Sequence, residues 1–543
     1  MAASSAPELI AGFRNQTTAA LDQLAEAVDT TFSLGAACII FLMQCGFGML
    51  EAGSVREKST RDILMKNLLD FAVGSLAWFF IGFMLAADGG APFIGFPGQN
   101  GAGSKITPFD VVQRVHGVDV AHYLMSLMYA VTSATIVSGA MAERTQIRAY
   151  LVSSSIMTAL TYPVVVHWVW SDRGWLSTRS SGAVFGGAFD FAGGGVVHVT
   201  GGFTALVAAW SAGPRTGRFD GLLTQPMRGH SSVLVVLGTM LLLVGWLGFN
   251  SGSIASISAP GAPVIAAQTA KRTVAAGGVS MLVVAAAVRA INKTWSVERA
   301  CNGLLAGLVS ITAGAPAVSD FASLAIGAAG GLLYLLVSCA VERSRTDDVL
   351  DAFAVHGACG LWSLMAVGLM ADLQSPPVEV LPTLRGALTG GDGSLLAAQL
   401  IASVSIAAWS LALGLLTFLP LRALGLLRID QDAELTGVDL VELGGSAYDT
   451  VSSSTQGAAP PARAAWRPVS PTDPIPGHIN GVAPGTPLTM RTDRPVELNG
   501  ETDVQLDANV ASGDGLGGRM GTPLPTDHPS QMVGEVAMGV AVP

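Results

Sequence analysis

Long apolar segments alternate with short polar ones along most of this 543-residue chain. A helix needs about 20 mainly apolar residues to cross the hydrocarbon core of a bilayer, and each apolar segment is long enough. The pattern therefore predicts an all-α integral membrane protein with eleven transmembrane helices. We place these helices near residues 31–53, 67–88, 119–142, 149–170, 194–212, 231–252, 263–288, 301–319, 321–341, 350–371 and 398–427.

The basic residues in the loops indicate how these helices are oriented. An odd number of spans puts the two termini on opposite sides, and cytoplasmic loops are enriched in Lys and Arg. Loops on one side carry five basic residues: Lys105, Arg114, Arg173, Arg179 and Arg385. Loops on the other side carry sixteen: Arg56, Lys58, Arg61, Lys66, Arg144, Arg148, Arg215, Arg218, Arg228, Arg289, Lys293, Arg299, Arg343, Arg345, Arg422 and Arg428. The sequence predicts a multi-pass plasma-membrane protein with an extracellular N-terminus and a cytoplasmic C-terminus.

The two ends of the chain lack this apolar pattern. Residues 1–30 form a predicted extracellular segment with helical periodicity, without the basic start of a secretory signal, and with an Asn-Gln-Thr glycosylation sequon at Asn15. The transmembrane domain is expected at 31–427, followed by a cytoplasmic regulatory region at 428–450. Residues 451–543 are rich in Pro, Gly, Ser, Thr and Asp. Such a segment cannot bury enough apolar surface to offset its ordering entropy, so we expect a disordered cytoplasmic tail.

Composition agrees with the membrane class. Half of the residues are hydrophobic, only 13% are charged, and the mean hydropathy is +0.52. The net charge of −10 belongs mainly to the C-terminal end, because the part from Arg428 onward has 15 acidic and 6 basic residues. The charge therefore indicates neither the solute nor a nucleic-acid partner. The five cysteines lie in apolar segments without metal-ligand spacing, so we expect no metal and no cofactor.

Two histidines stand inside apolar segments. His198 ends the string DFAGGGVVH, and His356 lies in DAFAVHGACG. Each follows an aspartate, Asp190 eight residues before the first and Asp351 five residues before the second. Ionisable side chains are costly within the hydrocarbon core, and they mark solute or proton pathways. The pair therefore predicts a pore for a small protonatable solute.

The two halves of the chain also echo each other. The string CGFGMLEAGS at 45–54 in the first span is similar to GWLGFNSGS at 245–253 in the sixth. His198 and His356 lie in the fifth and tenth predicted spans. Because five spans separate the partners, the halves would be inverted in the membrane, with equivalent elements meeting near the midplane. We predict an inverted five-plus-five repeat in which the two histidines face each other.

Seven strings together resemble the ammonium transporters of the Amt/Mep/Rh superfamily. They are MLEAGSVREKSTRDILMKNLLDF, SATIVSGAMAERTQ, YPVVVHWVW, DFAGGGVVH, GHSSVLVVLGTMLLLVGWLGFNSGS, CNGLLAGLVSITAG and DDVLDAFAVHGACGLW. The similarity covers approximately residues 30–450. It implies an ammonium-transporter-like fold of eleven spans with an extracellular N-terminus, an inverted repeat, and a homotrimer with one pore per subunit.

The resemblance also implies roles for seven residues. They are the twin pore histidines His198 and His356, the outer recruitment site Trp170 and Ser253, the aromatic gate Tyr129 and Phe249, and the buried structural acid Asp190. These roles make physical sense, because the face of an indole attracts a partly desolvated cation and a serine hydroxyl accepts an N–H bond.

These roles lead to a hypothesis for transport. Ammonium, or its analogue methylammonium, is captured outside and deprotonated near the gate. Ammonia then passes the histidines and is protonated again inside, because an intact ion in a low-dielectric pore costs far more than a neutral molecule. Potassium, similar in size, has no proton to give up and would be excluded.

Other functions on the same scaffold stay open. An ammonium sensor with slow flux would have the same sequence features, and a gas-permeating Rh-like protein shares the fold, although Trp170 with Ser253 favours ammonium. A metal-cation channel would need a TVGYG-like loop or a ring of acids, and an enzyme would need a motif such as GxSxG or HExxH. The apolar segments contain none of these motifs.

Four residues depart from the family pattern or from the membrane environment. The outer gate residue is usually Phe, whereas Tyr129 adds a hydroxyl, and Met125 stands where a further aromatic residue is common. Lys271 and Arg272 lie within the seventh predicted span, where each would cost about 3 kcal/mol if it faced lipid at mid-depth. We therefore expect both to face protein, water or the membrane interface.

The segment LRIDQDAELTGVDLVELGGSAYD at 427–449 resembles the family's C-terminal region, which docks under neighbouring subunits and couples their pores. Leu443 stands where a His is common. Thr450 and Ser452–Ser454 follow directly, and phosphorylation would add a charge of about −1.5 to −2 at each site. These features suggest a cytoplasmic regulator or kinase that acts on this region, and the alternative is a solvated Ser/Thr linker.

Overall fold

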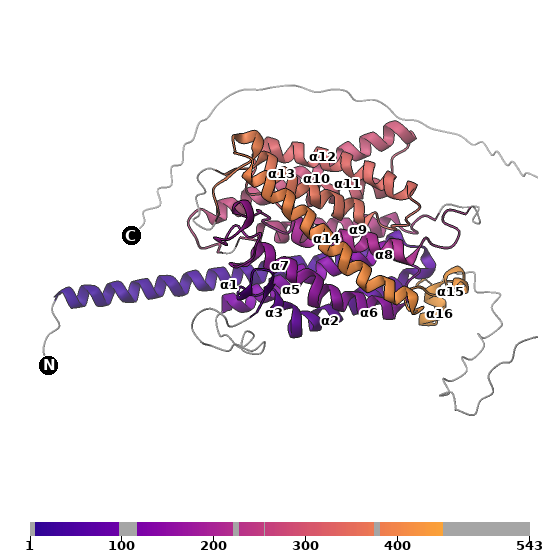
Figure 1. Ribbon diagram of the computed structural model, residues 1–543, viewed down its shortest axis with the longest axis horizontal. Helices are drawn as coiled ribbons and strands as arrows, with labels where there is room; N and C mark the ends of the chain where they lie inside the picture. Colours follow the sequence, from indigo (N-terminus) through magenta and orange to yellow (C-terminus); the bar gives the residue numbers. More distant parts are fainter. Residues whose placement is uncertain (1–5, 97–116, 221–226, 255, 374–380, 449–543) are drawn as a thin grey trace, which may run out of the picture. The chain divides into compact units, whose positions relative to one another are not determined.

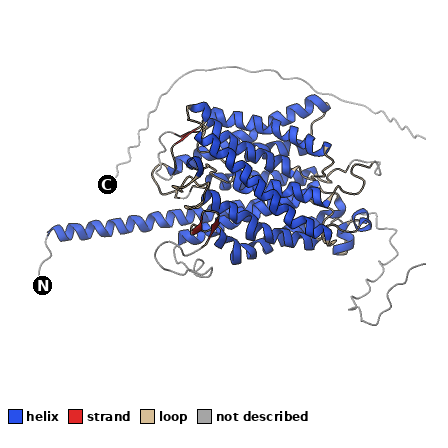
Figure 2. Cartoon of the chain, viewed as in Figure 1, coloured by secondary structure: helices blue, strands red, loops and turns tan. Residues whose placement is uncertain are grey.

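The computed structural model of the chain describes residues 6–96, 117–220, 227–254, 256–373 and 381–448, without the side chains of 6, 8, 9 and 117–119. Within these ranges helices dominate, and each strand has two residues (Figure 2). The predicted disordered tail at 451–543 and the expected phosphorylation sites at Thr450 and Ser452–Ser454 lie outside the described residues.

The long α-helices are α1 (Ala6–Ser54), α2 (Thr60–Ala77), α5 (Gly117–Ala140), α6 (Ile147–Ile156), α7 (Tyr162–Trp170), α8 (Thr200–Ala212), α9 (Ser232–Ser251), α10 (Ala262–Asn292), α11 (Val297–Thr312), α12 (Asp320–Arg343), α13 (Cys359–Met370) and α14 (Ser394–Ala423). Short α-helices are α3 (Phe83–Leu85), α15 (Gln431–Thr436) and α16 (Val438–Leu443). Four π-helical segments are η2 (Trp78–Gly82), η3 (Met157–Thr161), η5 (Gly194–Val199) and η6 (Phe353–Ala358). The 3₁₀ turns are η1 (Glu57–Ser59), η4 (Val184–Gly186) and η7 (Ala387–Thr389), and the antiparallel strand pairs are β1 (Gly90–Ala91) with β2 (Ile94–Gly95) and β3 (Asp372–Leu373) with β4 (Leu384–Arg385).

The described chain contains ten helices that are long and apolar enough to cross a membrane. They coincide with ten of the eleven predicted spans, so the expected all-α membrane fold is confirmed. The remaining predicted span, 301–319, overlaps α11, which has 16 residues. All its residues from Gly303 to Thr312 are buried, because α9, α10, α12 and α13 pack around it. The count of eleven crossings and the inverted repeat stay predictions.

The first helix differs from the expected division near residue 30. Helix α1 runs without a break for 49 residues, and its N-terminal part extends out of the helix bundle (Figure 1). The side chains of Ile10, Phe13, Leu21 and Leu24 on this extension are exposed. The polar N-terminal segment and the first span are therefore one continuous element.

The two histidine segments have the same unusual backbone. His198 lies in η5 and His356 in η6, which are both six-residue π-helical turns that continue into α8 and α13. Their chains approach closely at Gly202, where an added Cβ atom would lie only 2.1 Å from the backbone nitrogen of Gly357. A side chain at residue 202 would push the two segments apart, so glycine is needed to bring the histidines together. Single π-helical turns within α-helices are often found at functional sites.

A buried ion-pair cluster joins the loops at the arginine-rich end of the bundle. Arg215 donates to Glu143 (Nη1 to Oε1, 2.6 Å) and to Asp347 (Nε to Oδ2, 2.8 Å). Arg56 forms a second ion pair with Glu143. These residues come from the loops after α1, α5, α8 and α12. The cluster therefore connects four segments that are distant in sequence.

Acid is expected to weaken this cluster. Burial alone would raise the pKa of Glu143, but the charges of Arg215 and Arg56 outweigh it and hold that pKa below its ordinary value. The pKa of Asp347 is likewise lowered, against the effect of burial, by Arg215 and Arg144. Both carboxyls thus contribute stability above their unfolded-state pKa values of about 4, and this contribution is lost as the pH falls through the lowered folded-state values.

The measurement is the thermal unfolding midpoint of the detergent-solubilised protein between pH 7 and pH 3. We expect a nearly constant midpoint down to about pH 5 and a fall below about pH 4. The E143Q variant should be less stable at pH 7 and should lose less stability on acidification. Equal acid dependence in the two proteins would contradict the role assigned to the cluster.

Candidate substrate pore

His198 and His356 meet inside the bundle. Their Nδ1 atoms are 3.2 Å apart, and their rings stack with centroids 5.2 Å apart and an angle of 20° between the planes. One Nδ1 must donate and the other accept, so the two rings take opposite tautomeric roles. Both side chains are buried, and the Nε2 atom of His198 has no hydrogen-bond partner in the described structure. The geometry leaves a polar nitrogen available for a small guest.

Aromatic side chains surround the histidine pair. Trp246 of α9 stacks on His198, with centroids 5.2 Å apart and planes 13° apart. Phe47 of α1 lies beside His356, with ring centroids 6.1 Å apart. The sequence analysis did not single out these two residues. The similarity between CGFGMLEAGS and GWLGFNSGS could have revealed them, because aligning the glycines Gly46 and Gly245 matches Phe47 with Trp246.

The predicted gate residues also touch each other. Tyr129 of α5 and Phe249 of α9 pack edge to face, with ring centroids 4.5 Å apart. Phe249 in turn lies 5.7 Å from the ring of His198. Both gate rings are buried, so they separate the histidine pair from the Trp170 side of the bundle. A solute moving between the two regions would need these rings to move apart.

The predicted recruitment residues lie next to the gate. The ring of Trp170 is 5.9 Å from that of Tyr129. The hydroxyl of Ser253 donates to the carbonyl oxygen of Phe249 at 2.9 Å and lies 2.7 Å from the hydroxyl of Tyr129. The extra hydroxyl of Tyr129, noted from the sequence, is therefore within hydrogen-bond distance of the Ser253 hydroxyl. The structure brings together all four residues assigned to the outer site and the gate.

Asp190 acts on the backbone rather than lining the gate. Its Oδ1 accepts hydrogen bonds from the amides of Gly193 and Gly194, and its Oδ2 accepts from Gly195 and Val196, at 2.7–3.0 Å. Four amides at the start of η5 are therefore capped by one carboxylate. The carbonyl oxygen of the same residue accepts from Trp170 Nε1 at 2.6 Å. Asp190 thus positions both the His198 segment and the outer tryptophan.

The structure identifies Asp348, rather than Asp351, as the counterpart of Asp190. Asp348 lies eight residues before His356, the same spacing as between Asp190 and His198. Its Oδ1 and Oδ2 accept from the amides of Ala352 and Phe353 at 3.0 and 2.8 Å, which caps η6. Burial raises its pKa to about 7. The equal spacing in the sequence was the signal that could have found this residue.

Comparison with known proteins agrees with this geometry. A family model described as the Ammonium Transporter Family matches residues 31–448. The chain belongs to the ammonium transporter family. The resemblance inferred from the seven sequence strings is therefore confirmed.

Individual members of the ammonium transporter family are similar over most of their length. Ammonium transporter 1 member 3 of Solanum lycopersicum is 38% identical over 440 residues, which are 78% of this chain and 94% of the relative. Ammonium transporter Amt2 of Archaeoglobus fulgidus is 36% identical over 431 residues, which are 78% of this chain and 88% of the relative. The similarity thus extends over most of the length of both relatives rather than over one motif.

Solved structures of ammonium transporter proteins share the fold. The Sensor Amt Protein superposes with a TM-score of 0.68 at 28% identity and covers 78% of this chain and 99% of its own. The crystal structure of Candida albicans Mep2 gives a TM-score of 0.64 at 26% identity and covers 74% of this chain and 86% of its own. This chain is accordingly a multi-pass membrane protein with the ammonium transporter fold.

The charged residues that were unexpected for an ammonium transporter lie away from the histidine pair. Lys271 and Arg272 both bind Asp320, at 2.6 and 3.0 Å, where α12 begins. Lys271 is exposed, and Arg272 also donates to the carbonyl oxygens of Ala315 and Pro316. Their charges are therefore matched by an acid and by backbone acceptors at one end of the bundle.

Two other polar residues, Asp351 and His167, have structural partners. Asp351 accepts from Arg299 Nη1 at 2.8 Å, and also from Tyr334 and Ser338. His167 is buried, with its Nδ1 2.7 Å from the carbonyl oxygen of Ala87 and its Nε2 2.8 Å from that of Ala91. These contacts hold a helix and a loop in place, and neither residue contacts the histidine pair.

The C-terminal region contacts the loops at the arginine-rich end of its own chain. Asp439 of α16 accepts from the amides of Arg61 and Asp62 at 2.9 and 2.8 Å, which caps the start of α2. The buried Glu434 of α15 accepts from Arg428 and from the amide of Thr216. The predicted regulatory region is thus linked directly to the start of α2 and to the loop after α8.

Proposed function

We propose that this protein conducts ammonium across the plasma membrane through the pore lined by Trp170, Tyr129, Phe249, His198 and His356. The continuous contact of these five rings, which ends at two hydrogen-bonded imidazoles, is the observation that carries the proposal. Membership of the ammonium transporter family supports ammonium as the substrate. The named relatives are transporters, so we propose a transport function without enzymatic activity.

Ammonium is first bound at the outer side. The indole face of Trp170 attracts the cation as it sheds water, an interaction of about 1–2 kcal/mol, and Ser253 accepts one N–H bond. The edge-to-face contact of Tyr129 with Phe249 blocks the way to the histidines. The backbone carbonyl of Asp190 accepts a hydrogen bond from Trp170 Nε1, which keeps the indole in place for this role.

Beyond the gate the solute travels as ammonia, after ammonium has given its proton to water on the outer side of the gate. The surroundings of the histidines are apolar and buried, and an ion without a partner is strongly disfavoured there. Ammonia both donates and accepts hydrogen bonds, which matches a pair of imidazoles that offers a donor and an acceptor. Potassium cannot lose a proton and is excluded at this step.

The placement of the protein follows the charge of its loops. We propose an extracellular N-terminus and a cytoplasmic C-terminus, because the basic residues gather at the end of the bundle where α15 and α16 bind. We further propose a homotrimer with one pore per subunit, methylammonium as a second substrate, and a cytoplasmic regulator acting on 428–450. The buried bonds of Glu434 and Asp439 to the loops support this regulatory role.

Sensing with slow flux is the second candidate function. The hydroxyl of Tyr129 lies 3.0 Å from the carbonyl oxygen of Phe249 and 2.7 Å from the hydroxyl of Ser253, and its single proton bonds one of these two oxygens, which closes the gate with a polar bond. The Sensor Amt Protein is among the solved structures with the same fold. A sensor would bind ammonium at Trp170 and transmit the signal through the C-terminal region.

Flux through the purified protein separates these functions. The full-length chain in liposomes is exposed to inward gradients of ammonium, methylammonium or potassium, while internal pH, uptake of labelled methylammonium and current are recorded. We expect saturable uptake of ammonium and methylammonium and none of potassium. Equal responses to ammonium and potassium would contradict the proposal, and saturable ammonium binding without uptake would favour the sensor.

A further inference from the structure

A second polar group, the side chain of Glu51, lies close to the histidine pair. Glu51 is near the C-terminal end of α1, and its side chain is 1% exposed. Its Oε2 accepts a hydrogen bond from Asn67 Nδ2 at 2.6 Å, and its Oε1 accepts one from the hydroxyl of Ser138. Both oxygens therefore accept from neutral donors.

Glu51 has no counter-ion among the described residues. No Lys or Arg nitrogen described in the structure lies within 4.0 Å of its carboxylate. The ammonium group of Lys66 is already bound to Asp62 Oδ2 at 2.6 Å and to the carbonyl oxygen of Thr145 at 2.7 Å. A buried carboxylate without a paired cation is strongly disfavoured, so this position suits a cation from outside the chain.

Glu51 and His356 line the same small cavity. The cavity has a volume of about 20 Å³ and is also lined by Phe47 and Thr135, with apolar side chains around the rest. This volume admits one molecule of the size of water, which is also the size of ammonia or ammonium. The aromatic ring of Phe47 is suited to a cation as well. The cavity therefore links the end of the histidine pair to an unpaired carboxylate.

We propose that Glu51 and this cavity form an inner cation site, in which the solute leaving His356 is held as ammonium before release. This inference rests on the proposed transport function. Without a cation the buried Glu51 carboxyl is protonated. The lone pair of ammonia takes that proton, and the electron pair of the broken O–H bond stays on the carboxylate. Glu51 takes a proton from the cytoplasmic solution when the ammonium leaves. The resulting ammonium donates N–H bonds to the Glu51 carboxylate, which supplies the missing counter-charge.

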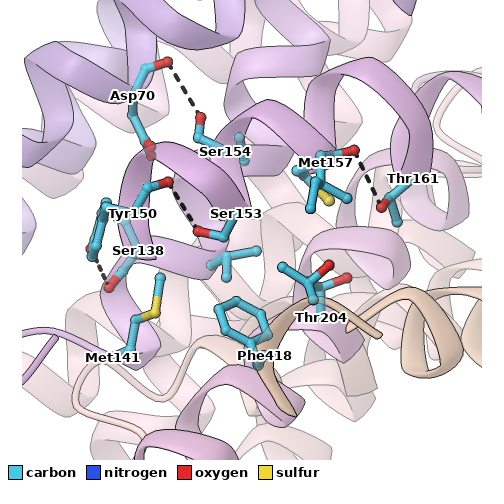
Figure 3. A pocket seen from close by; sticks show the side chains of 14 residues that line it. Asp70, Ser138, Met141, Tyr150, Ser153, Ser154, Met157, Thr161, Thr204 and Phe418 are labelled. Atoms are coloured by element: carbon cyan, nitrogen blue, oxygen red, sulfur yellow. Dashed lines mark hydrogen bonds between the residues drawn. The ribbon is translucent and has the colours of Figure 1, made fainter. Parts of the chain in front are cut away.

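A neighbouring cavity supplies a matched control. It has a volume of about 10 Å³ and is lined by Asp70, Tyr150 and Ser138 among others (Figure 3). The hydroxyl of Tyr150 donates to the carbonyl oxygen of Ser138 at 2.7 Å, as the dashed line shows. Asp70 is also a buried carboxyl residue, but it does not line the cavity that contains His356. Its neutralisation tests for general effects of removing a buried acid.

The test compares E51Q with D70N in full-length protein reconstituted into liposomes. Glutamine keeps the size of Glu51, and its amide can donate to the otherwise unpartnered Oδ1 of Asn67. Loss of a charged partner for ammonium should lower the maximal uptake about tenfold, with the external half-saturation changed by less than about twofold. D70N should stay within about twofold of the unmutated protein. Ammonium placed inside the liposomes should slow uptake by the unmutated protein and by D70N, but not by E51Q.

Infrared difference spectroscopy tests the same site in the unmutated protein, so the result does not depend on whether a variant folds. Addition of ammonium to unmutated protein labelled with ¹³C-glutamate should shift a glutamate carboxylate band, and potassium should not. The site would be overturned if E51Q transported ammonium as fast as the unmutated protein and were inhibited equally by internal ammonium. It would also be overturned if ammonium left the glutamate band of the unmutated protein unchanged. An unmutated protein that does not transport ammonium would instead overturn the proposed function, and the inner site with it.

Discussion

Replacing His198 or His356 with alanine is expected to lower ammonium uptake about a hundredfold, because the buried pore loses a hydrogen-bond partner for ammonia and the other imidazole loses its own partner. Each imidazole depends on the other, because their Nδ1 atoms share one hydrogen bond of 3.2 Å. Alanine at either position removes that bond and leaves the remaining ring without a fixed tautomer. The measurement is labelled methylammonium uptake into liposomes, together with the response to a potassium gradient.

The double variant distinguishes a pair from two separate sites. Because the rings act as a unit, the H198A/H356A protein should be no more than about twofold slower than either single variant. His122, at the start of α5, serves as a control, and H122A should transport at the unmutated rate. Undiminished uptake that still excludes potassium in H198A or H356A would refute the pairing.

Replacing Asp190 with alanine is expected to cause the largest loss of stability, about 3–5 kcal/mol, because buried amides lose their acceptors. One carboxylate caps four consecutive amides at the start of η5, from Gly193 to Val196. The residues of this turn are buried, so alanine at position 190 would leave these amides without that acceptor. The start of η5 should therefore unfold locally. The backbone carbonyl of residue 190, which accepts the hydrogen bond from Trp170, should also move.

The thermal unfolding midpoint in detergent measures this loss of stability. Two further variants test whether the loss depends on the number of amide hydrogen bonds removed. D190N keeps one acceptor oxygen for two of the four amides, so it should lose about half as much stability as D190A. D348A removes a cap with two amide bonds and should resemble D190N rather than D190A. Equal stability of D190A and the unmutated protein would show that the cap does not support the fold.

The sequence did not predict which acid caps the His356 segment. Asp190 and Asp351 both precede a histidine in an apolar segment, and the sequence paired them for that reason. In the structure Asp351 binds Arg299, whereas Asp348 caps the His356 segment as Asp190 caps that of His198. Three acids lie close together in one loop: Asp347, Asp348 and Asp351. The backbone of the folded loop points their side chains in different directions, and it thereby decides which carboxylate reaches which partner.

The sequence by itself determined the membrane class, the apolar spans, the basic end and the two histidines that do not suit lipid. These properties depend on local composition, because the bilayer penalises polar groups one residue at a time. The sequence also predicted that His198 and His356 face each other, and in the structure they are in contact. Only the tertiary structure decided that Trp246 and Phe47 flank them and that Glu51 lines the same cavity as His356. These contacts join residues more than a hundred positions apart in most cases. They depend on the packing angles and close approaches of helices, such as that at Gly202, which local composition does not specify.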